Sequence, residues 1–226
     1  SHIQSKGGGT GQNGNGVNIF RAANVVISGN RITDCAYSAV RGNAASNIQI
    51  IANSAQRIGE VALYAEFGFE GAVIANNLVD GAATGISVTN FNEGGRLAVV
   101  EGNLIRTLHR REHEAVDKRG EGISVEADSI VAGNVVENAP TCGIMVGWGR
   151  YMRNVLVTHN LIRDTATGIL ISADAQAGSC LVSSNLIAET KNGAIRAMAF
   201  GQPEGPDLAA RRDDRQRISV SDNLVG

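Results

Sequence analysis

The stretch VLVTHNLIRDTATGILI, residues 155–171, contains the two motifs that decide the fold of this chain. In the first motif, Val157 is followed three positions later by Asn160. In the second, Gly168 precedes two aliphatic residues, Ile169 and Ile171, on either side of a variable position. Both motifs recur along the chain, and recurrence at a nearly fixed distance is typical of a repeat architecture.

The asparagine motif occurs eight times, at steps of 23 to 38 residues, in Asn30, Asn53, Asn77, Asn103, Asn134, Asn160, Asn185 and Asn223. The aliphatic partners are Ile27, Ile50, Ile74, Val100, Val131, Val157, Val182 and Val220. The glycine motif follows most of them, in the segments 85–88, 122–125, 143–146 and 168–171, with looser copies at 39–42, 62–65 and 193–196. The two motifs together therefore define one repeating unit.

Each unit holds about three strand-length pieces and no helix-period stretch, which excludes a βαβ unit. Three short strands per unit predict an all-β fold, a single-stranded right-handed parallel β-helix of about eight coils, stacked at roughly 4.8 Å. Asparagine suits the turn because it tolerates the left-handed backbone conformation. Stacked side-chain amides can also pair into a ladder. We therefore interpret the eight asparagines as structural and not as a site.

Alternation along a strand predicts which side chains face outward. In the glycine motif, the two aliphatic side chains should point inward, and the variable residue and the residue after the motif should point outward. The predicted outward pairs are Asn18 and Phe20, Arg41 and Asn43, Tyr64 and Glu66, Ser87 and Thr89, Ser124 and Glu126, Met145 and Gly147, Leu170 and Ser172, and Ile195 and Ala197. The first half of this face is polar. We expect the segment 197–217, or another subunit, to cover the apolar second half beside Trp148.

Composition excludes several classes of function. With 20 basic and 22 acidic residues the net charge is −2, so neither a nucleic-acid footprint nor a patch for anionic membranes is predicted. No apolar run is long enough for a membrane span. Cys35, Cys142 and Cys180 share no metal-ligand spacing and are interpreted as buried apolar residues, and no cofactor is predicted. No signal peptide opens the chain, and Ser1-His2 suggests either a remnant of cloning or a start inside a longer protein.

The repeat predicts one β-helix domain over residues 17–226. Residues 1–16 are interpreted as a flexible Gly/Asn-rich lead-in or the end of an upstream coil. Loop insertions are predicted at 89–96, 106–121, 147–153 and 197–217, and loops on a rigid scaffold usually carry the function. Open coil ends expose strand edges, so self-association through the apolar face or the coil ends is also expected.

The polar half of the outward face holds the candidate site. Glu66 and Glu126 share one offset two coils apart, hence about 9.6 Å between their backbones. Inverting glycosidases separate their carboxyl groups by roughly 6.5–9.5 Å, so the two are a candidate catalytic pair flanked by Arg41 and Tyr64. Chemistry at a uronate would instead need a cation and a base, roles open to Arg41, Arg111, Arg119, Tyr64 or His113. The alternative is a solvated strand face without catalysis.

Loops and aromatic residues would complete a substrate groove. Asn92 lies in the loop 89–96, and Arg111 and Arg119 lie in the loop 106–121, so these side chains would line the walls. Trp148 and Tyr151 would form a platform for sugar rings, or would pack against the segment 197–217.

The loop 106–121 also contains a metal-like motif. His109-Arg110-Arg111-Glu112-His113 matches the H-x-x-E-H pattern of inverted zinc peptidases. Those enzymes need the motif on a helix with a further acidic ligand, whereas here it lies between strands. We therefore predict a charged loop or a cleft wall, and no metal site.

The asparagine turn and the glycine motif resemble the right-handed parallel β-helix repeats of the pectin-lyase-like superfamily over about residues 17–226. The repeats are most similar to twin-arginine-exported bacterial repeat proteins, which implies a periplasmic or secreted location. The superfamily includes polysaccharide lyases, hydrolases, C5-epimerases, phage tailspikes and adhesins. The acidic calcium cluster of pectate lyases and the Asp-Pro-His motif of alginate epimerases are both absent from this sequence.

We therefore expect an extracytoplasmic carbohydrate-binding protein whose partner is a polysaccharide or oligosaccharide. Lyase, hydrolase or epimerase activity is left open. The alternative is a non-catalytic structural or adhesive repeat module.

Overall fold

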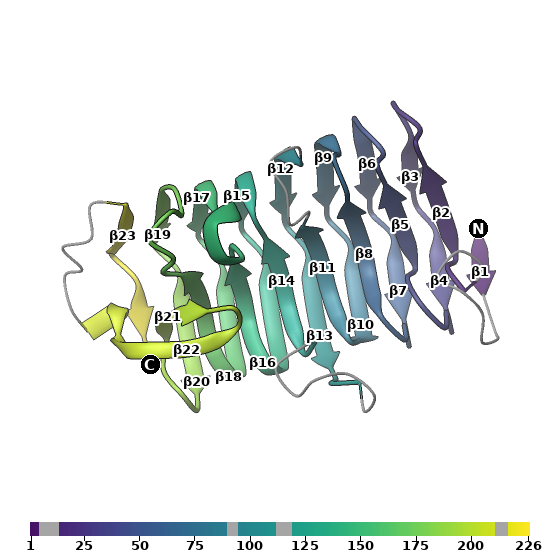
Figure 1. Cartoon of the computed structure of the whole chain (residues 1–226). Helices are drawn as coiled ribbons and strands as arrows, with labels where there is room; N and C mark the ends of the chain where they lie inside the picture. The colour runs from purple at the N-terminus through teal and green to yellow at the C-terminus, as the bar shows by residue number, and fades with distance from the viewer. Residues whose placement is uncertain (5–13, 90–94, 112–118, 211–216) are drawn as a thin grey trace.

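The computed structural model describes residues 1–4, 14–89, 95–111, 119–210 and 217–226. The chain winds into a parallel β-helix whose strands line up in long stacks (Figure 1). Each turn adds one strand to each of three faces, and seven complete turns, from β3 to β21, precede an incomplete eighth turn. The predicted all-β solenoid with three short strands per coil is confirmed.

The first face contains β3 (Val26–Ser28), β6 (Ile48–Ile51), β9 (Glu70–Ala75), β12 (Arg96–Glu101), β15 (Ala127–Ala132), β17 (Arg153–Thr158), β19 (Cys180–Ser183) and β23 (Ile218–Ser221). The second face contains β1 (His2–Gln4), β4 (Arg31–Thr33), β7 (Ser54–Gln56), β10 (Leu78–Ala82), β13 (Leu104–Leu108), β20 (Leu186–Thr190) and β24 (Leu224–Val225). The third face contains β2 (Val17–Phe20), β5 (Val40–Asn43), β8 (Val61–Glu66), β11 (Thr84–Thr89), β14 (Glu121–Val125) and β21 (Ile195–Ala199). The long strands β16 (Val135–Val146) and β18 (Leu161–Ser172) bend from the second face into the third. Two short 3₁₀ helices, η1 (Gly149–Tyr151) and η2 (Leu208–Ala210), lie in the later turns.

The asparagine ladder runs the length of the solenoid between the first and second faces. Each ladder asparagine from Asn30 to Asn185 donates from its backbone N–H and its side-chain Nδ2 to the Oδ1 of the next one, at 2.9–3.1 Å. The six inner asparagines are buried, and the amides satisfy turn backbone that would otherwise lack partners. The structural interpretation of the eight asparagines is confirmed.

The physical reason that we gave for asparagine at this turn needs correction. The left-handed conformation belongs to the residue before each ladder asparagine, namely Gly29, Ala52, Asn76, Gly102, Gly133, His159, Ser184 and Asp222. No ladder asparagine has a positive φ. The side-chain amide, and not backbone tolerance, is therefore what the ladder position requires.

Aliphatic side chains fill the interior, as alternation predicts. Ile86, Ile123, Ile144 and Ile169 are fully buried and lie in one register across neighbouring strands of the third face. The three cysteines are free thiols buried in the structure, as expected. Within the described residues, no helix combines the length and the apolar character that crossing a membrane would need.

Part of segment 197–217 packs on the apolar half of the third face, as predicted, because Met198 is buried in one cluster with Met145 and Leu170. Strand β22 (Gln202–Asp207) turns back antiparallel to β21, and the Phe200 ring meets the Trp148 ring edge-on at 5.6 Å between centroids. Trp148 packs against the same cluster, in which Met145 and Leu170 are buried. Ile195 was predicted to point outward, but it lies in the core in register with Ile169.

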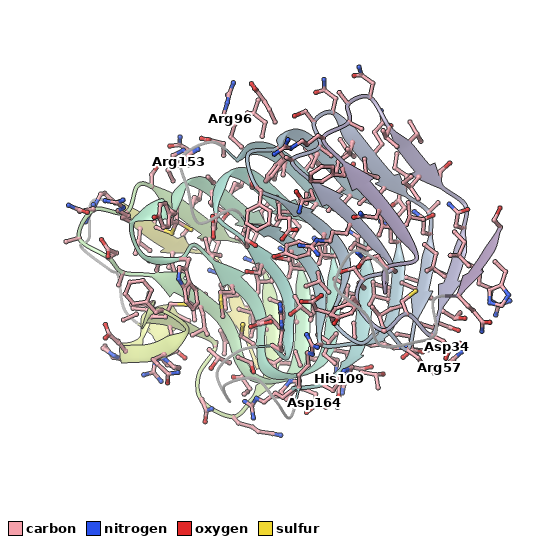
Figure 2. The ribbon with its side chains drawn as sticks, turned by 45° about the vertical axis from the view of Figure 1, so that its right-hand side comes forward. Asp34, Arg57, Arg96, His109, Arg153 and Asp164 are labelled. Atoms are coloured by element: carbon pink, nitrogen blue, oxygen red, sulfur yellow. The ribbon has the colours of Figure 1, made fainter. Side chains whose placement is uncertain are left out.

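Charged side chains gather at the corners of the solenoid. Asp34 and Arg57 pair on neighbouring turns, and Figure 2 shows the two side by side at one corner. The Arg57 guanidinium holds the pKa of the Asp34 carboxyl below its usual range. Because such exposed pairs are well solvated, they contribute little to stability, and the amide ladder and the core hold the coils together.

Candidate functional site

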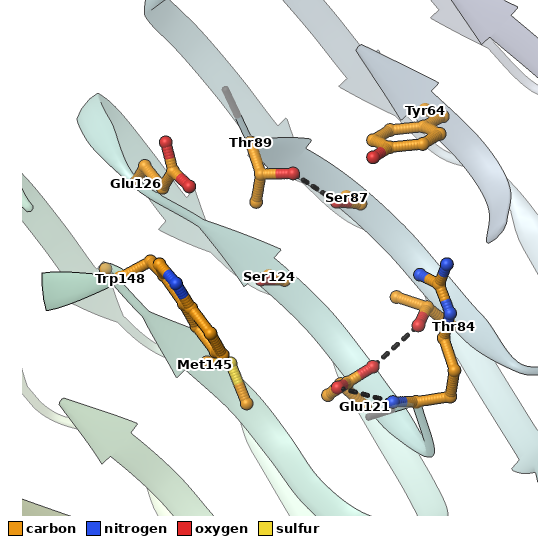
Figure 3. A pocket seen from close by; sticks show the side chains of 11 residues that line it. Tyr64, Thr84, Ser87, Thr89, Glu121, Ser124, Glu126, Met145 and Trp148 are labelled. Atoms are coloured by element: carbon orange, nitrogen blue, oxygen red, sulfur yellow. Dashed lines mark hydrogen bonds between the residues drawn. The ribbon is translucent and has the colours of Figure 1, made fainter. Parts of the chain in front are cut away.

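A pocket of about 380 Å³ opens on the third face. We call it the serine pocket, and it is lined by Tyr64, Thr84, Ser87, Thr89, Arg119, Glu121, Ser124, Glu126, Met145, Gly147 and Trp148. Its volume is within the range of small-ligand sites. Figure 3 shows Ser87 and Ser124 between the Tyr64 ring and the Trp148 ring.

The strand register explains why the face is hollow here. Tyr64, Ser87, Ser124 and Met145 occupy one outward row on four successive strands. The two middle members are small, whereas the outer two are large. A depression therefore forms between Tyr64 and Met145, and three strand spacings of about 4.8 Å make this row roughly 14 Å long.

Hydroxyl groups form the floor of the serine pocket. The Ser87 and Thr89 hydroxyls lie 2.9 Å apart within hydrogen-bonding distance, and Ser124 extends the row on the next strand. Hydroxyl groups both donate and accept, so such a floor can match either kind of polar group on a ligand.

Glu121 forms one end of the pocket. The Thr84 hydroxyl donates to its Oε2 at 2.6 Å, and the Arg119 backbone N–H donates to its Oε1 at 2.9 Å. Burial raises the pKa of the Glu121 carboxyl, and this effect exceeds the opposing effects of the Thr84 hydrogen bond and the Arg119 charge.

A stability measurement can check the state of Glu121. A carboxyl whose pKa is raised on folding contributes stability that is fully present below its unfolded pKa and lost as the pH rises through its folded pKa. Glu121→Gln should therefore melt at a higher temperature than the wild type at pH 7. The difference in melting temperature should disappear as the pH falls toward 4.5, the ordinary pKa of a Glu carboxyl. Thermal melts across this range measure the gap, and a gap that widens toward acid would contradict the assignment.

The loop 106–121 is pinned beside this end of the pocket by its described residues. The Arg119 guanidinium donates to Glu60 at 3.0 Å, and Arg111 lies 3.6 Å from the same carboxylate. Arg110 donates to the Pro140 carbonyl at 2.6 Å. Since Arg119 lines the pocket, these contacts fix one wall to the scaffold.

Glu66 lies next to the pocket and outside its lining. Its carboxylate accepts from Asn43 at 3.0 Å and forms an ion pair with Arg41. Arg41 also lies 5.9 Å from the centroid of the Tyr64 ring. Burial, and after it the Glu66 charge, raises the pKa of the Tyr64 phenol, so that residue is a neutral hydrogen-bonding aromatic group.

The predicted site residues fall into three groups. Tyr64, Arg119, Glu126 and Trp148 line the serine pocket together. Glu66, Arg41, Arg111 and Tyr151 are not part of the lining. His113 and Asn92 lie outside the described residues, so their predicted roles stay predictions.

Two other expectations concern the charged loop and the exposure of the carboxylates. Among the described residues, no group of His, Cys, Asp and Glu could hold a metal ion. Of the H-x-x-E-H motif, Glu112 and His113 lie outside the described residues, so that motif is not tested as a whole. Glu66 and Glu126 are only 3 % exposed, so neither lies on a solvated strand face.

Sequence reasoning missed Glu121 because the alternation breaks at Gly122. A Cβ on Gly122 would meet Val136 of the core, and Ile123 also points inward, so Glu121 turns outward. Strict alternation would have placed a carboxylate in the aliphatic interior. A charged residue at an inward position beside a glycine was therefore the signal for this break.

Comparison with known proteins agrees with this architecture. A family model described as "Right handed beta helix region" matches residues 7–153. The chain belongs to this right-handed β-helix family. The handedness predicted from the repeats is therefore confirmed.

Solved structures similar to this chain include tailspike proteins of E. coli bacteriophage HK620 in complex with pentasaccharide. A double mutant aligns with a TM-score of 0.55 at 13% identity, and a single mutant with 0.54 at 14%. Each alignment covers 94% of this chain and 44% of the tailspike chain, so the chain spans less than half of that protein. At this identity the likeness shows the fold alone. No curated protein sequence matches the chain.

Proposed function

We propose that this chain binds a segment of an oligosaccharide or polysaccharide in the serine pocket. The observation that carries the proposal is the row Tyr64, Ser87, Ser124 and Met145 with Trp148 beside it, which joins aromatic ends to a hydroxyl floor. A sugar ring has an apolar face that packs on aromatic rings, and its edge carries hydroxyls that hydrogen-bond to side chains. The aromatic rings of the pocket match the apolar face of a sugar, and its hydroxyl groups match the sugar hydroxyls.

Two further features support sugar binding. The pocket sits on rigid strands, so little ordering is needed when a ligand enters. The tailspike structures of similar fold hold a pentasaccharide, which makes a sugar ligand a reasonable first choice for this chain. A periplasmic or secreted location, where polysaccharides are met, belongs to the same proposal.

Catalysis remains a separate prediction. Glu121 begins β14 and Glu126 follows its end, so the two side chains line opposite ends of the pocket. Glu66 is engaged by Arg41 and Asn43. The described geometry therefore supports binding better than hydrolysis, and the predicted catalytic roles of Glu66, Glu126, Arg41 and His113 are still to be tested.

The single tryptophan gives a direct readout of the pocket. Trp148 is the only tryptophan in the chain, so its fluorescence reports ligand entry without a label. Ser124→Phe fills the pocket floor and should weaken the binding of any oligosaccharide at least tenfold, because the ring occupies the space of the ligand. Fluorescence titration and calorimetry with a panel of neutral oligosaccharides measure the change.

Ser54→Phe is the matched control. Ser54 is a half-buried serine on β7 of the second face, away from the serine pocket. This variant should bind as the wild type does. If no oligosaccharide binds the wild type, or if Ser124→Phe binds unchanged, the proposal is wrong, and the structural or adhesive module becomes the better interpretation.

A further inference from the structure

The charged groups around the serine pocket indicate which sugars it accepts. Figure 3 shows Glu121 and Glu126 at opposite ends of the lining. Among the described lining residues, Arg119 supplies the only positive charge. A ligand lying along the pocket would therefore meet a carboxyl group at either end.

The positive charges near the pocket all contact carboxylates. Arg119 donates to Glu60, and Arg111 approaches the same carboxylate. Arg41 pairs with Glu66 beside Tyr64. Counting these pairs together with the pocket carboxyls gives three guanidinium groups against four carboxyl groups, so the described surroundings hold no excess of positive charge.

We propose, on the basis of the proposed sugar binding, that the serine pocket selects uncharged sugars and rejects sugars that carry a carboxylate, such as uronates. A uronate entering the pocket would bring a further negative charge near Glu126, and its carboxylate would meet the buried Glu121 carboxyl at the other end. Repulsion between like charges is strong where protein replaces water, and transfer of the carboxylate out of water adds a further cost. A neutral sugar meets neither penalty.

The state of Glu121 fits an uncharged ligand. A carboxyl whose pKa is raised by burial stays protonated to a higher pH than usual, and it can then donate a hydrogen bond to a sugar hydroxyl. Lyases and epimerases that act on uronates need a cation to neutralise the substrate carboxylate. Because Arg41 is held by Glu66, and Arg111 and Arg119 share the Glu60 carboxylate, the described pocket is not arranged for that chemistry.

Matched ligand pairs test the selection. Each pair consists of an oligosaccharide of galacturonate, glucuronate or mannuronate and the same oligosaccharide after chemical reduction of its carboxyl groups, which keeps length and linkage. At pH 7 and low salt, the reduced member should bind the wild type at least tenfold more tightly by Trp148 fluorescence. Neutral oligosaccharides from the panel above are titrated alongside.

Two changes should reduce the difference in affinity between the acidic and the reduced member of a pair. Glu126→Gln removes one negative charge from the pocket, and 1 M NaCl screens the charges in the unaltered protein, with a Debye length of about 3 Å. An acidic member that binds as tightly as its reduced partner overturns the charge selection and leaves sugar binding intact. A complete lack of binding by reduced and neutral sugars overturns both proposals.

Discussion

Asn103→Ala is expected to lower the free energy of unfolding by roughly 4 kcal/mol, the largest effect that we predict for a single substitution. The Asn103 side chain is buried and makes four hydrogen bonds: it accepts from the N–H and the Nδ2 of Asn77, and it donates to Ile74 O and Asn134 Oδ1. Alanine removes all four and leaves buried partners unsatisfied, at about 1–3 kcal/mol for each unsatisfied group. Urea unfolding followed by circular dichroism measures the loss.

Two other asparagine substitutions serve as controls for this prediction. Asn18 lies exposed on β2 outside the ladder, so Asn18→Ala should change stability by less than about 0.5 kcal/mol. Asn30 begins the ladder and is only partly buried, and Asn30→Ala should fall between the two. If Asn103→Ala cost no more than Asn18→Ala, the ladder would not be what fixes the coils to one another.

The fold could be predicted because the same structural demand recurs eight times. One asparagine per turn, three residues after a core aliphatic, requires the turns to be equal and stacked, and the hydrogen bonds from Asn30 to Asn223 follow that order. A single copy of the motif would have carried no such information. One detail could not be predicted from the repeats. The residue before each asparagine has the left-handed conformation, but its type varies among Gly, Ala, Asn, His, Ser and Asp, so the sequences of the repeats show no common residue there.

The site was only partly predictable because alternation gives the side of a strand but not the partners of a side chain. Alternation placed Tyr64 and Ser124 on the outside, and both line the pocket. It could not show that Arg41 pairs with Glu66 on the neighbouring coil, which depends on side-chain conformation. It failed for Glu121, where alternation breaks at Gly122. It failed for Ile195 because this copy of the motif begins at Ala194 and not at Gly193, which puts Ile195 in register with the inward Ile169.

The ladder lies at the corner between the first and second faces and the pocket lies on the third face, so stability and binding are independent to a first approximation. Asn103 lies between the first and second faces, whereas Ser124 points outward from the third. Substitutions at sites without shared partners usually add in their effects. Variation on the third face can therefore change the ligand without loss of the scaffold.

Gly122→Ala is expected to destabilise the protein by about 3 kcal/mol, because it overpacks the corner between the second and third faces. A Cβ at this position would lie 2.4 Å from the Gly143 carbonyl oxygen and 2.5 Å from Val136 Cγ1. The first contact involves backbone of the next coil, which cannot move without disturbing the parallel strand pairing between β14 and β16. Urea unfolding of the variant and the wild type gives the difference.

The chain supplies a matched reverse substitution for this prediction. Ala62 occupies the same row two strands away, since Leu63 aligns with Ile86 and Ile86 with Ile123. Ala62→Gly removes one buried methyl group and should cost only about 1 kcal/mol. In a Val136→Ala background, Gly122→Ala should cost less than in the wild type, because one of its two clashes is gone. An equal cost in both backgrounds would mean that the contact with the Gly143 carbonyl alone, and not the contact with the Val136 side chain, requires glycine at this corner.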